Sequence, residues 1–308
     1  SVAEKREMWR EAVEQAANML VMHPYPGFDG KYFSMPCRNI VPKPAQKPHP
    51  PLWVACSRRE TIHEAARRGI GALTFAFVDP GEAVKWVKEY YDIIKSDACV
   101  PIGHAVNANI AMVSGFSCHR DAEEAARRGL DGFRFFGYAL GHHYIFGEHT
   151  PGRTDIWANF EQARAHLPDM GGRTGIGTPA QLRENMGKFA GAGVDQVIFV
   201  QQGGRNRHEQ SCEPLALFAD EVMPEFKARE AARQQAKAAE LAPYIAAAMA
   251  RKKKLAPLAE AEIPKLIALG RQIAQQESKD GTTANFGRGS EMAVPLEDPL
   301  KKAKAAGD

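Results

Sequence analysis

Residues 52–57 read LWVACS and residues 60–69 read ETIHEAARRG, a short apolar run followed by a helical pattern that stops at Gly69. The same alternation returns three times. ALTFAFV (72–78) precedes a helix in which Asp79 can cap and Pro80 can open the first turn, and NANIAMVSGFS (107–117) precedes RDAEEAARRGL. TPAQLRENMGKFAGAG (178–193) leads into DQVIFVQQ (195–202), and EPLALFADEVMPEF (213–226) closes the series.

Strands that are apolar on both faces and alternate with helices indicate a parallel sheet covered by helices, which is an α/β fold. We therefore expect strands near 52–57, 72–78, 107–115 and 196–202 to lie parallel and adjacent in that order, with right-handed crossovers. A closed (β/α)8 barrel of the TIM type needs eight strands. These four predict an incomplete barrel of the TIM type, and a doubly wound sheet is the alternative that the pattern leaves open.

The remaining segments divide the chain into three regions. Residues 1–51 hold an amphipathic helix at 4–22 and an irregular connection at 23–51, which contains eight prolines. Residues 52–227 form the α/β region, with an aromatic, His-rich and Gly-rich insertion at 130–177. Residues 228–308 are Ala-rich and Lys-rich. We expect them to form peripheral helices, one of them near 262–277, to contribute little to the core, and to lack regular structure from about Ser278.

Composition excludes several classes of protein. No apolar run is long enough to span a membrane and the N-terminus has no signal-peptide pattern, so we expect a cytoplasmic protein. The five cysteines form no C-x-x-C pair, which argues against a zinc ribbon or a disulfide framework. The net charge is +3, and the basic tail has no interleaved aromatic residues, so nucleic-acid binding is not expected.

Three segments together resemble the bacterial luciferase-like family of flavin-dependent monooxygenases. They are VPKPAQKPHPPLWVACS (41–57), GIGTPAQLRENMGKFAGAGVDQVIFVQQ (175–202) and GRNRHEQSCEPLALFADEVMPEFK (204–227). The resemblance runs from about Glu4 to Lys227 and implies barrel units five to eight, with units one to four absent. The chain starts at Ser1 within a helical pattern, which suggests that upstream sequence is missing.

The resemblance implies that reduced FMN, supplied by a flavin reductase, and dioxygen are used to oxygenate a small organic substrate, and that the full-length protein is a homo-oligomer. A deazaflavin-dependent hydride transfer on the same fold is an alternative. A catalytically inactive half-barrel and a metal-dependent barrel hydrolase are further alternatives.

The end of the first predicted strand is a candidate phosphate site. Ser57 ends the strand and Thr61 lies in the first turn of the next helix, where free backbone N–H groups and the helix dipole attract anions. Read from the residues alone, Ser57 is equally suited to cap the helix. The resemblance implies that this turn, with Cys56, holds the phosphate of FMN.

The polar loop after the last strand is a second candidate. Loops at this end of a barrel meet the ligand. We therefore expect Gln201, Gln202, Gly203 and Arg205 to bind the cofactor, and His208 is the candidate catalytic donor to a substrate oxygen. A solvated loop with internal ion pairs is the alternative.

In the insertion, His142, His143 and Tyr144 are candidates for a substrate-facing lid. No metal site is predicted, because the H-E-x-x-H spacing is missing from GHHYIFGEH.

GIGTPA (175–180) satisfies G-x-G-x-x-A, but no strand is predicted before it. We interpret it as a helix start, with Thr178 as the cap and Pro179 in the first turn.

Overall fold

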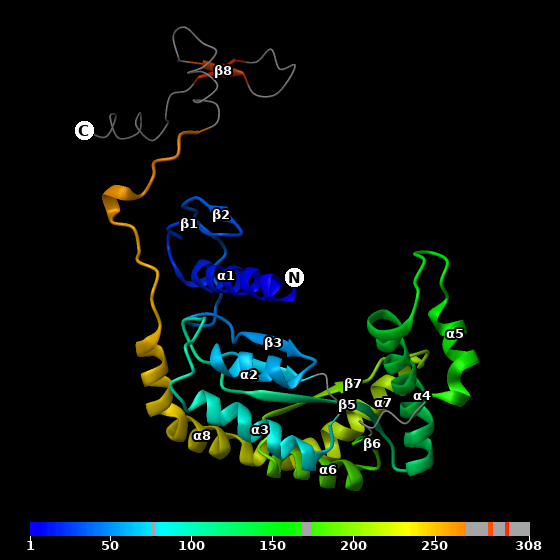
Figure 1. Ribbon diagram of the computed structural model, residues 1–308. Helices are drawn as coiled ribbons and strands as arrows, with labels where there is room; N and C mark the ends of the chain where they lie inside the picture. Colours follow the sequence, from blue (N-terminus) through cyan, green and yellow to red (C-terminus); the bar gives the residue numbers. More distant parts are fainter. Residues whose placement is uncertain (75–77, 168–173, 269–282, 286–292, 296–308) are drawn as a thin grey trace.

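A parallel sheet forms the centre of the protein in the computed structural model, which describes residues 1–74, 78–167, 174–268, 283–285 and 293–295 (Figure 1). Hydrogen bonds join its strands in the order β3-β4-β5-β7, and β6 pairs with the end of β5 beyond the β7 pairing. The strands are β3 (Trp53–Cys56), β4 (Gly71–Thr74), β5 (Ile110–Cys118), β6 (Gly175–Gly177) and β7 (Gln196–Val200).

All of these pairings are parallel, so the predicted order of the four strands is confirmed. Part of the second predicted strand, residues 75–77, lies outside the described residues. β6 is a correction, since a short strand does precede the helix at Pro179. Its three residues include two glycines and are too few to show a strand period. Within the described ranges, β3 and β7 each pair with one strand, and the sheet does not close into a barrel.

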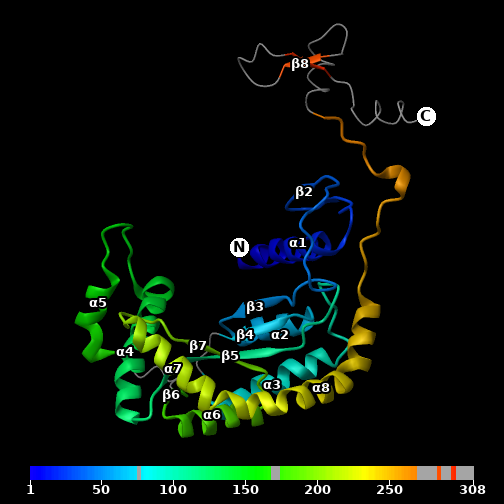
Figure 2. The same cartoon turned by 180° about the vertical axis from the view of Figure 1, so that it is seen from behind.

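Helices cover one face of the sheet (Figures 1 and 2). They include α2 (Arg59–Arg67), α3 (Pro80–Ile94) and α6 (Pro179–Gly191). The Asp79 side chain accepts from the Glu82 N–H, with Pro80 in the first turn of α3. Thr178 forms a capping box with Gln181 at the start of α6. Both predicted helix starts are thus confirmed, because caps depend on residues close in sequence.

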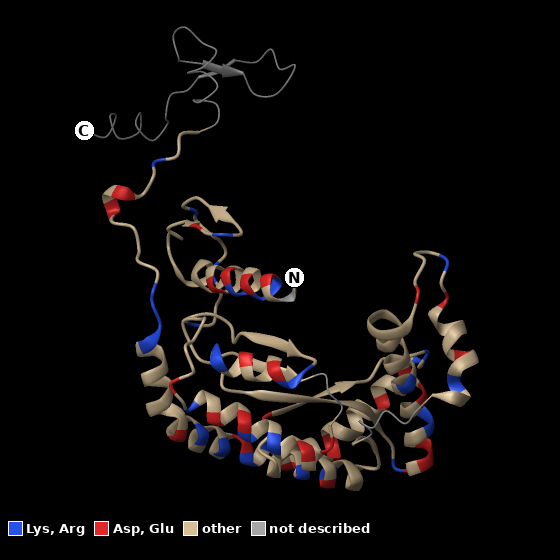
Figure 3. Ribbon diagram, viewed as in Figure 1, with Lys and Arg blue, Asp and Glu red and all other residues tan. Residues whose placement is uncertain are grey.

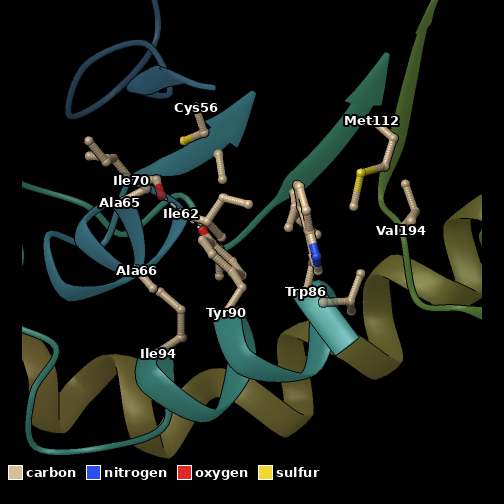
Figure 4. Packing of buried hydrophobic residues seen from close by; sticks show 14 of the residues in the cluster. Cys56, Ile62, Ala65, Ala66, Ile70, Trp86, Tyr90, Ile94, Met112 and Val194 are labelled. Atoms are coloured by element: carbon tan, nitrogen blue, oxygen red, sulfur yellow. Dashed lines mark hydrogen bonds between the residues drawn. The ribbon is translucent and has the colours of Figure 1, made fainter. Parts of the chain in front are cut away.

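The main core lies between these helices and the sheet (Figure 4). Tyr90 and Ile94 of α3 point toward Ile62 of α2, and each of these side chains is at most 1% exposed. Burial of such a side chain stabilises the fold by about 1.5 to 3 kcal/mol. The Tyr90 hydroxyl donates to the carbonyl oxygens of Ile70, at 2.9 Å, and Asn107, at 3.0 Å, so its polar end is satisfied inside the core.

The N-terminal region begins with α1 (Val2–Val21), which confirms the predicted helix. The proline-rich connection after it is irregular except for a short antiparallel hairpin, formed by β1 (Phe28–Asp29) and β2 (Ser34–Met35). Lys43 donates from Nζ to the carbonyl oxygens of Met19 and Met22, at 2.7 Å each, and so ties the connection to the last turn of α1.

The insertion contains more helix than the sequence predicts. The helix predicted at 120–130 continues as α4 (Ala122–Gly141) and passes into the π-helical turn η1 (His142–Phe146). After a loop come α5 (Ile156–Ala163) and the 3-10 turn η2 (Arg164–His166), and residues 168–173 are outside the described part of the chain. Figures 1 and 2 both show this insertion at the end of the molecule away from α1.

The C-terminal region differs most from the prediction. The closing helix is two helices, α7 (His208–Glu221) and α8 (Met223–Arg251). Leu241 and Ala248 of α8, 3% and 1% exposed, belong to the main core, so the prediction that residues 228–308 contribute little is wrong. The next elements are the 3-10 turn η3 (Glu260–Glu262) and an antiparallel pair, β8 (Thr283–Asn285) and β9 (Ala293–Pro295).

These elements correct two further expectations for the C-terminal region. Residues 264–268 have no regular structure, so no helix is present in this described part of the predicted 262–277 segment, and residues 269–277 are not described. The expected lack of regular structure from Ser278 is wrong at β8 and β9, because their backbones pair with each other.

Asp195, just before β7, ties α8 to the amino ends of β5 and β7. Its side chain, 2% exposed, accepts hydrogen bonds from the Tyr91 hydroxyl at 2.6 Å and from the Ile110 N–H at 2.9 Å. Two cations of α8 reach the same carboxylate, Arg233 at 3.0 Å and Lys237 at 2.6 Å. Burial, together with the charge of Asp195, raises the pKa of Tyr91, and burial lowers the pKa of Lys237. A buried carboxylate needs such partners, and α8 supplies two of them.

No helix within the described residues is both long and apolar enough to cross a membrane.

Candidate functional site

The turn between β3 and α2 is open to an anion. Ser57 is exposed, and the residue that caps α2 is Arg58, which makes no side-chain capping hydrogen bond. The interpretation of Ser57 as the helix cap is therefore wrong. The N–H groups in the first turn of a helix lack partners within the helix and carry its positive dipole end. The Thr61 N–H donates to the Arg58 carbonyl oxygen at 3.0 Å, and because no side chain caps the helix, the N–H groups before Thr61 are the ones that an oxyanion such as a phosphate can reach.

A cleft of about 560 Å³ adjoins this turn, and its volume lies within the range of small-molecule sites. Thr61 of α2, Trp9 of α1 and Val54 of β3 are among its lining residues. Ser57 is not among them. The other lining residues are mostly charged: Lys5, Arg6, Arg10, Glu60, Glu64 and Arg67, together with Ala65. The cleft thus joins an aromatic ring, a hydroxyl and several cations beside the α2 N-terminus.

Glu64 neutralises part of this positive charge. It accepts from Arg10 at 2.8 Å and from Arg68 at 3.0 Å. Burial alone would raise the pKa of Glu64, but the hydrogen bonds from Arg68 and Arg10 outweigh burial and hold the pKa below its ordinary value. Figure 3 shows acidic and basic residues alternating along α1, which faces β3 and α2 across this cleft. Lys5 and Arg6 of α1 lie on the cleft and are exposed to solvent.

Cys56 lies just before the turn, with its thiol in the core. The residue is fully buried, and its Sγ donates to the Val54 carbonyl oxygen at 3.4 Å. Burial raises the pKa of the Cys56 thiol to about 12. Figure 4 shows the side chain among the core residues above Ile62. The Cys56 thiol therefore belongs to the core, and Cys56 is not among the residues that line the cleft.

The loop after β7 packs against the insertion. Gly203 is buried against Gly132 of α4, where an added Cβ on Gly132 would stand 2.0 Å from the Gly203 carbonyl oxygen. The guanidinium of Arg205 lies over the Trp157 ring of α5, 4.7 Å from its centroid. Gln201 donates from Nε2 to the Ser211 carbonyl oxygen, and Gln202 is exposed. These contacts hold the loop at the carboxyl edge of the sheet, where the β3–α2 turn also lies.

His208 is the first residue of α7, although the sequence places it in the loop. It is exposed, and its Nε2 lies 3.4 Å from Sγ of Cys212, one helical turn later. The structure therefore leaves the imidazole accessible to solvent at the end of the loop. It does not bring His208 into contact with the cleft beside Thr61.

The insertion residues differ in burial. His142 is 5% exposed at the start of η1, whereas His143 is exposed and Tyr144 is 82% exposed. His142, His143 and His149 each offer a ring nitrogen, and these nitrogens lie within 4.8 Å of one another. Sequence spacing did not predict that the three rings come together, because the π-helical turn after α4 decides it.

The parallel sheet covered by helices on one face defines an α/β protein. The sequence profile of the luciferase-like monooxygenases matches residues 1–196, and the chain belongs to this family. An FMNH(2)-dependent dimethylsulfone monooxygenase of Pseudomonas putida is 28% identical over 181 residues, which cover 56% of this chain and 47% of that protein. The chain thus spans about half the length of this curated relative.

Solved structures show the same fold. A monooxygenase from Streptomyces bottropensis superposes with a TM-score of 0.53 at 22% identity, covering 73% of this chain and 63% of that one. Coenzyme F420-dependent tetrahydromethanopterin reductase from Methanopyrus kandleri has a TM-score of 0.51 at 18% identity, covering 70% of this chain and 62% of that one. At this identity the likeness concerns the fold.

Sequence reasoning missed Trp9 and Trp157, which contribute the aromatic surfaces of the cleft and of the β7 loop. Neither had a local signal. Trp9 lies on the apolar side of a helix, where an aromatic residue is ordinary core, and only the packing of α1 over β3 shows that it faces a cleft. Trp157 is recognised only by its contact with Arg205, which is distant in the sequence.

Proposed function

We propose that the chain binds reduced FMN at the β3–α2 turn and contributes half of the active site of a flavin-dependent monooxygenase, which uses dioxygen to oxygenate a small organic substrate. The observation that carries this proposal is the uncapped start of α2 next to Ser57, Thr61 and a cation-lined cleft. Membership in the luciferase-like family supports the choice of a flavin over other phosphorylated ligands.

The residues have distinct roles in this proposal. The α2 N–H groups, with the Ser57 and Thr61 hydroxyls, hold the phosphate, and Lys5 and Arg6 add charge at the cleft. Gln201, Gln202, Gly203 and Arg205 form a wall at the same edge of the sheet, because the ends of parallel strands meet there.

His208 serves as a donor to a substrate oxygen, and the insertion, including His142, His143 and Tyr144, covers the site. The contacts of the β7 loop with Gly132 and Trp157 support a coupling between this lid and the site. When bound, the flavin supplies the oxygenation chemistry, and the protein orients it and excludes water.

Oxygenation is proposed to require further β/α units. A flavin ring needs walls on both sides, and the strands β3 and β7 each have one neighbour among the described residues. We also propose a flavin reductase as the partner that supplies reduced FMN, a homo-oligomeric assembly for the full-length protein and a cytoplasmic location, where reduced flavin is produced.

The phosphate turn is tested by titrating FMN and riboflavin separately into the purified chain and following flavin fluorescence. Two or three charge-assisted hydrogen bonds of about 1.5 to 3 kcal/mol each, less the entropy of association, give a Kd in the millimolar to high-micromolar range. We expect FMN to bind at least about tenfold more tightly than riboflavin, because riboflavin lacks the phosphate.

Substitution of both hydroxyl residues, Ser57→Ala with Thr61→Ala, should weaken FMN by about tenfold or more and leave riboflavin unchanged. Arg6→Ala should also weaken FMN, and Lys188→Ala, which removes an exposed cation of α6 outside the cleft, is the matched control. Equal binding of the two flavins, or no effect of the double substitution, would show that the turn is an ordinary helix start.

The deazaflavin alternative predicts a different reaction. A deazaflavin enzyme of this fold transfers hydride and consumes no dioxygen. Two readouts on the chain joined to further barrel units separate these reactions: oxygen uptake with reduced FMN indicates the monooxygenase, and oxidation of reduced deazaflavin without oxygen uptake indicates hydride transfer. The absence of both oxygen uptake and deazaflavin oxidation would favour the third possibility, an inactive half-barrel.

A further inference from the structure

Three imidazoles meet in the insertion, and none of them lines the cleft beside the β3–α2 turn. One ring nitrogen from each of His142, His143 and His149 lies within 4.8 Å of those of the other two. The ring centroids are 5.2 Å apart for His142 and His143, 5.8 Å for His142 and His149, and 5.2 Å for His143 and His149. Such a separation leaves room for one ion between the rings but not for a protein side chain.

The inner imidazole is missing a partner. His142 is 95% buried, and its Nε2 has no hydrogen bond within the described structure. An unsatisfied polar atom inside a protein costs about 1 to 3 kcal/mol, so such an atom requires an explanation. The other ring nitrogen, Nδ1, lies against Gly147, where an added Cβ would stand only 2.2 Å away. Nε2 is therefore the buried polar atom of His142 that lacks a partner in the described structure.

The turn is constructed so that the rings converge. The chain leaves α4 through the π-helical turn η1, which is closed by a hydrogen bond of 2.9 Å from the Gly147 N–H to the His142 carbonyl oxygen. Gly141 makes room for the ring of Phe146, since an added Cβ would stand 2.6 Å from it. π-helical turns within helices frequently mark functional sites.

The chemistry of the donors selects a class of ion. Three neutral imidazoles without a carboxylate suit Zn²⁺, Ni²⁺, Cu²⁺ or Co²⁺ and not Mg²⁺ or Ca²⁺, which prefer oxygen. At metal–nitrogen distances of about 2.0 to 2.1 Å, two ligands of a tetrahedral ion stand about 3.3 Å apart. The nitrogens must therefore approach by up to about 1.5 Å. His143 and His149 are exposed and free to move, and His142 is the fixed member.

We propose that His142, His143 and His149 bind one divalent transition-metal ion of the zinc class, with its fourth position open to water. The ion satisfies His142 Nε2 and joins the end of α4 to the loop that follows η1. The cluster shares no residue with the phosphate turn or with the cleft, although His142 and His143 also belong to the insertion that is proposed to cover the flavin site. Metal binding is therefore measured without flavin.

The experiment uses the purified full chain with any histidine tag removed and metal stripped by a chelator. Zn²⁺ is titrated by calorimetry, and Co²⁺ is titrated by visible absorption, in which a four-coordinate ion gives far stronger bands than the hydrated ion. We expect one equivalent per chain at micromolar Kd or tighter, intense Co²⁺ bands, and displacement of Co²⁺ by Zn²⁺. A Kd weaker than about 1 mM, or only the weak spectrum of hydrated Co²⁺, would overturn the proposal.

Variants locate the site. His143→Ala and His149→Ala, both at exposed positions, should each weaken Zn²⁺ by at least about tenfold, since even loss of residues behind metal ligands costs 10-fold to 100-fold. His142→Ala should do the same, with folding checked by circular dichroism. His166→Ala is the matched control, because His166 is an exposed histidine of the same insertion outside the cluster. Equal loss in the control, or none in the three variants, assigns the binding elsewhere.

Discussion

Asp195→Ala tests how the C-terminal helix is held. The substitution removes a carboxylate whose side chain is 2% exposed and which accepts hydrogen bonds from Tyr91 and from the backbone of Ile110. It also leaves Lys237 without its anionic partner, with a side chain only 16% exposed. The loss is therefore larger than that of a surface ion pair, which contributes about 0 to 1 kcal/mol.

Removing one partner of a buried ion pair costs about 3 to 5 kcal/mol, because the other charge stays buried and unpaired. Total stabilities are about 5 to 15 kcal/mol. With a urea m-value of about 2 kcal/mol per molar, the midpoint of unfolding should fall by roughly 1.5 to 2.5 M. Asp220→Ala, at an exposed position of α7, is the control and should change the free energy of unfolding by less than about 0.5 kcal/mol.

The measurement is urea unfolding followed by circular dichroism. A second substitution tests whether the unpaired charge of Lys237 causes the loss of stability. Lys237→Met in the Asp195→Ala background should recover part of the lost stability, because it removes that charge. A cost below about 1 kcal/mol for Asp195→Ala, or a further loss on adding Lys237→Met, would refute the reasoning that α8 is held by this buried pair.

Three further predictions concern other parts of the chain. Gly132→Ala should destabilise the protein by about 1 to 3 kcal/mol in thermal or urea unfolding, because its Cβ would overlap the loop after β7. Gly187→Ala in α6, where an added Cβ meets nothing within 4 Å, should instead stabilise the protein by about 0.5 to 1 kcal/mol. The reverse order of stabilities would contradict the packing of α4 on that loop. At pH 8 a thiol reagent should label the exposed Cys212 rapidly and leave Cys56 unlabelled until the protein unfolds, because burial raises the pKa of the Cys56 thiol to about 12. Labelling is followed by mass spectrometry, and equal rates for the two cysteines would disprove the burial of Cys56. Arg68 and Arg10 hold the pKa of Glu64 below the ordinary 4.5, so the stabilising contribution of Glu64 is complete above pH 4.5 and is lost as pH falls through the lowered pKa. The free energy of unfolding, measured from pH 6 to 3, should therefore fall less in Glu64→Gln than in the unsubstituted protein. Identical pH profiles would count against this ion pair.

The sequence by itself determined the parts of the protein that depend on near neighbours along the chain. Apolar runs between helical patterns placed the four predicted strands, and their parallel order followed from the crossovers. Asp79 and Thr178 marked the starts of α3 and α6, since a cap acts within three residues. The family was also evident from segments such as VPKPAQKPHPPLWVACS, and the family profile matches residues 1–196.

Only the tertiary structure decided features that join distant residues. The Ala-rich composition of α8 favours a solvated helix, but the pairing of Asp195 with Lys237, 42 residues away, brings α8 into the core. Likewise, GHHYIFGEH has no metal spacing on a regular helix, and the π-helical turn brings its histidines together. A local pattern cannot predict such contacts, because the partner of a buried charge or of a ring is often distant in the sequence. Only the packing of the sheet and its helices brings the two residues together.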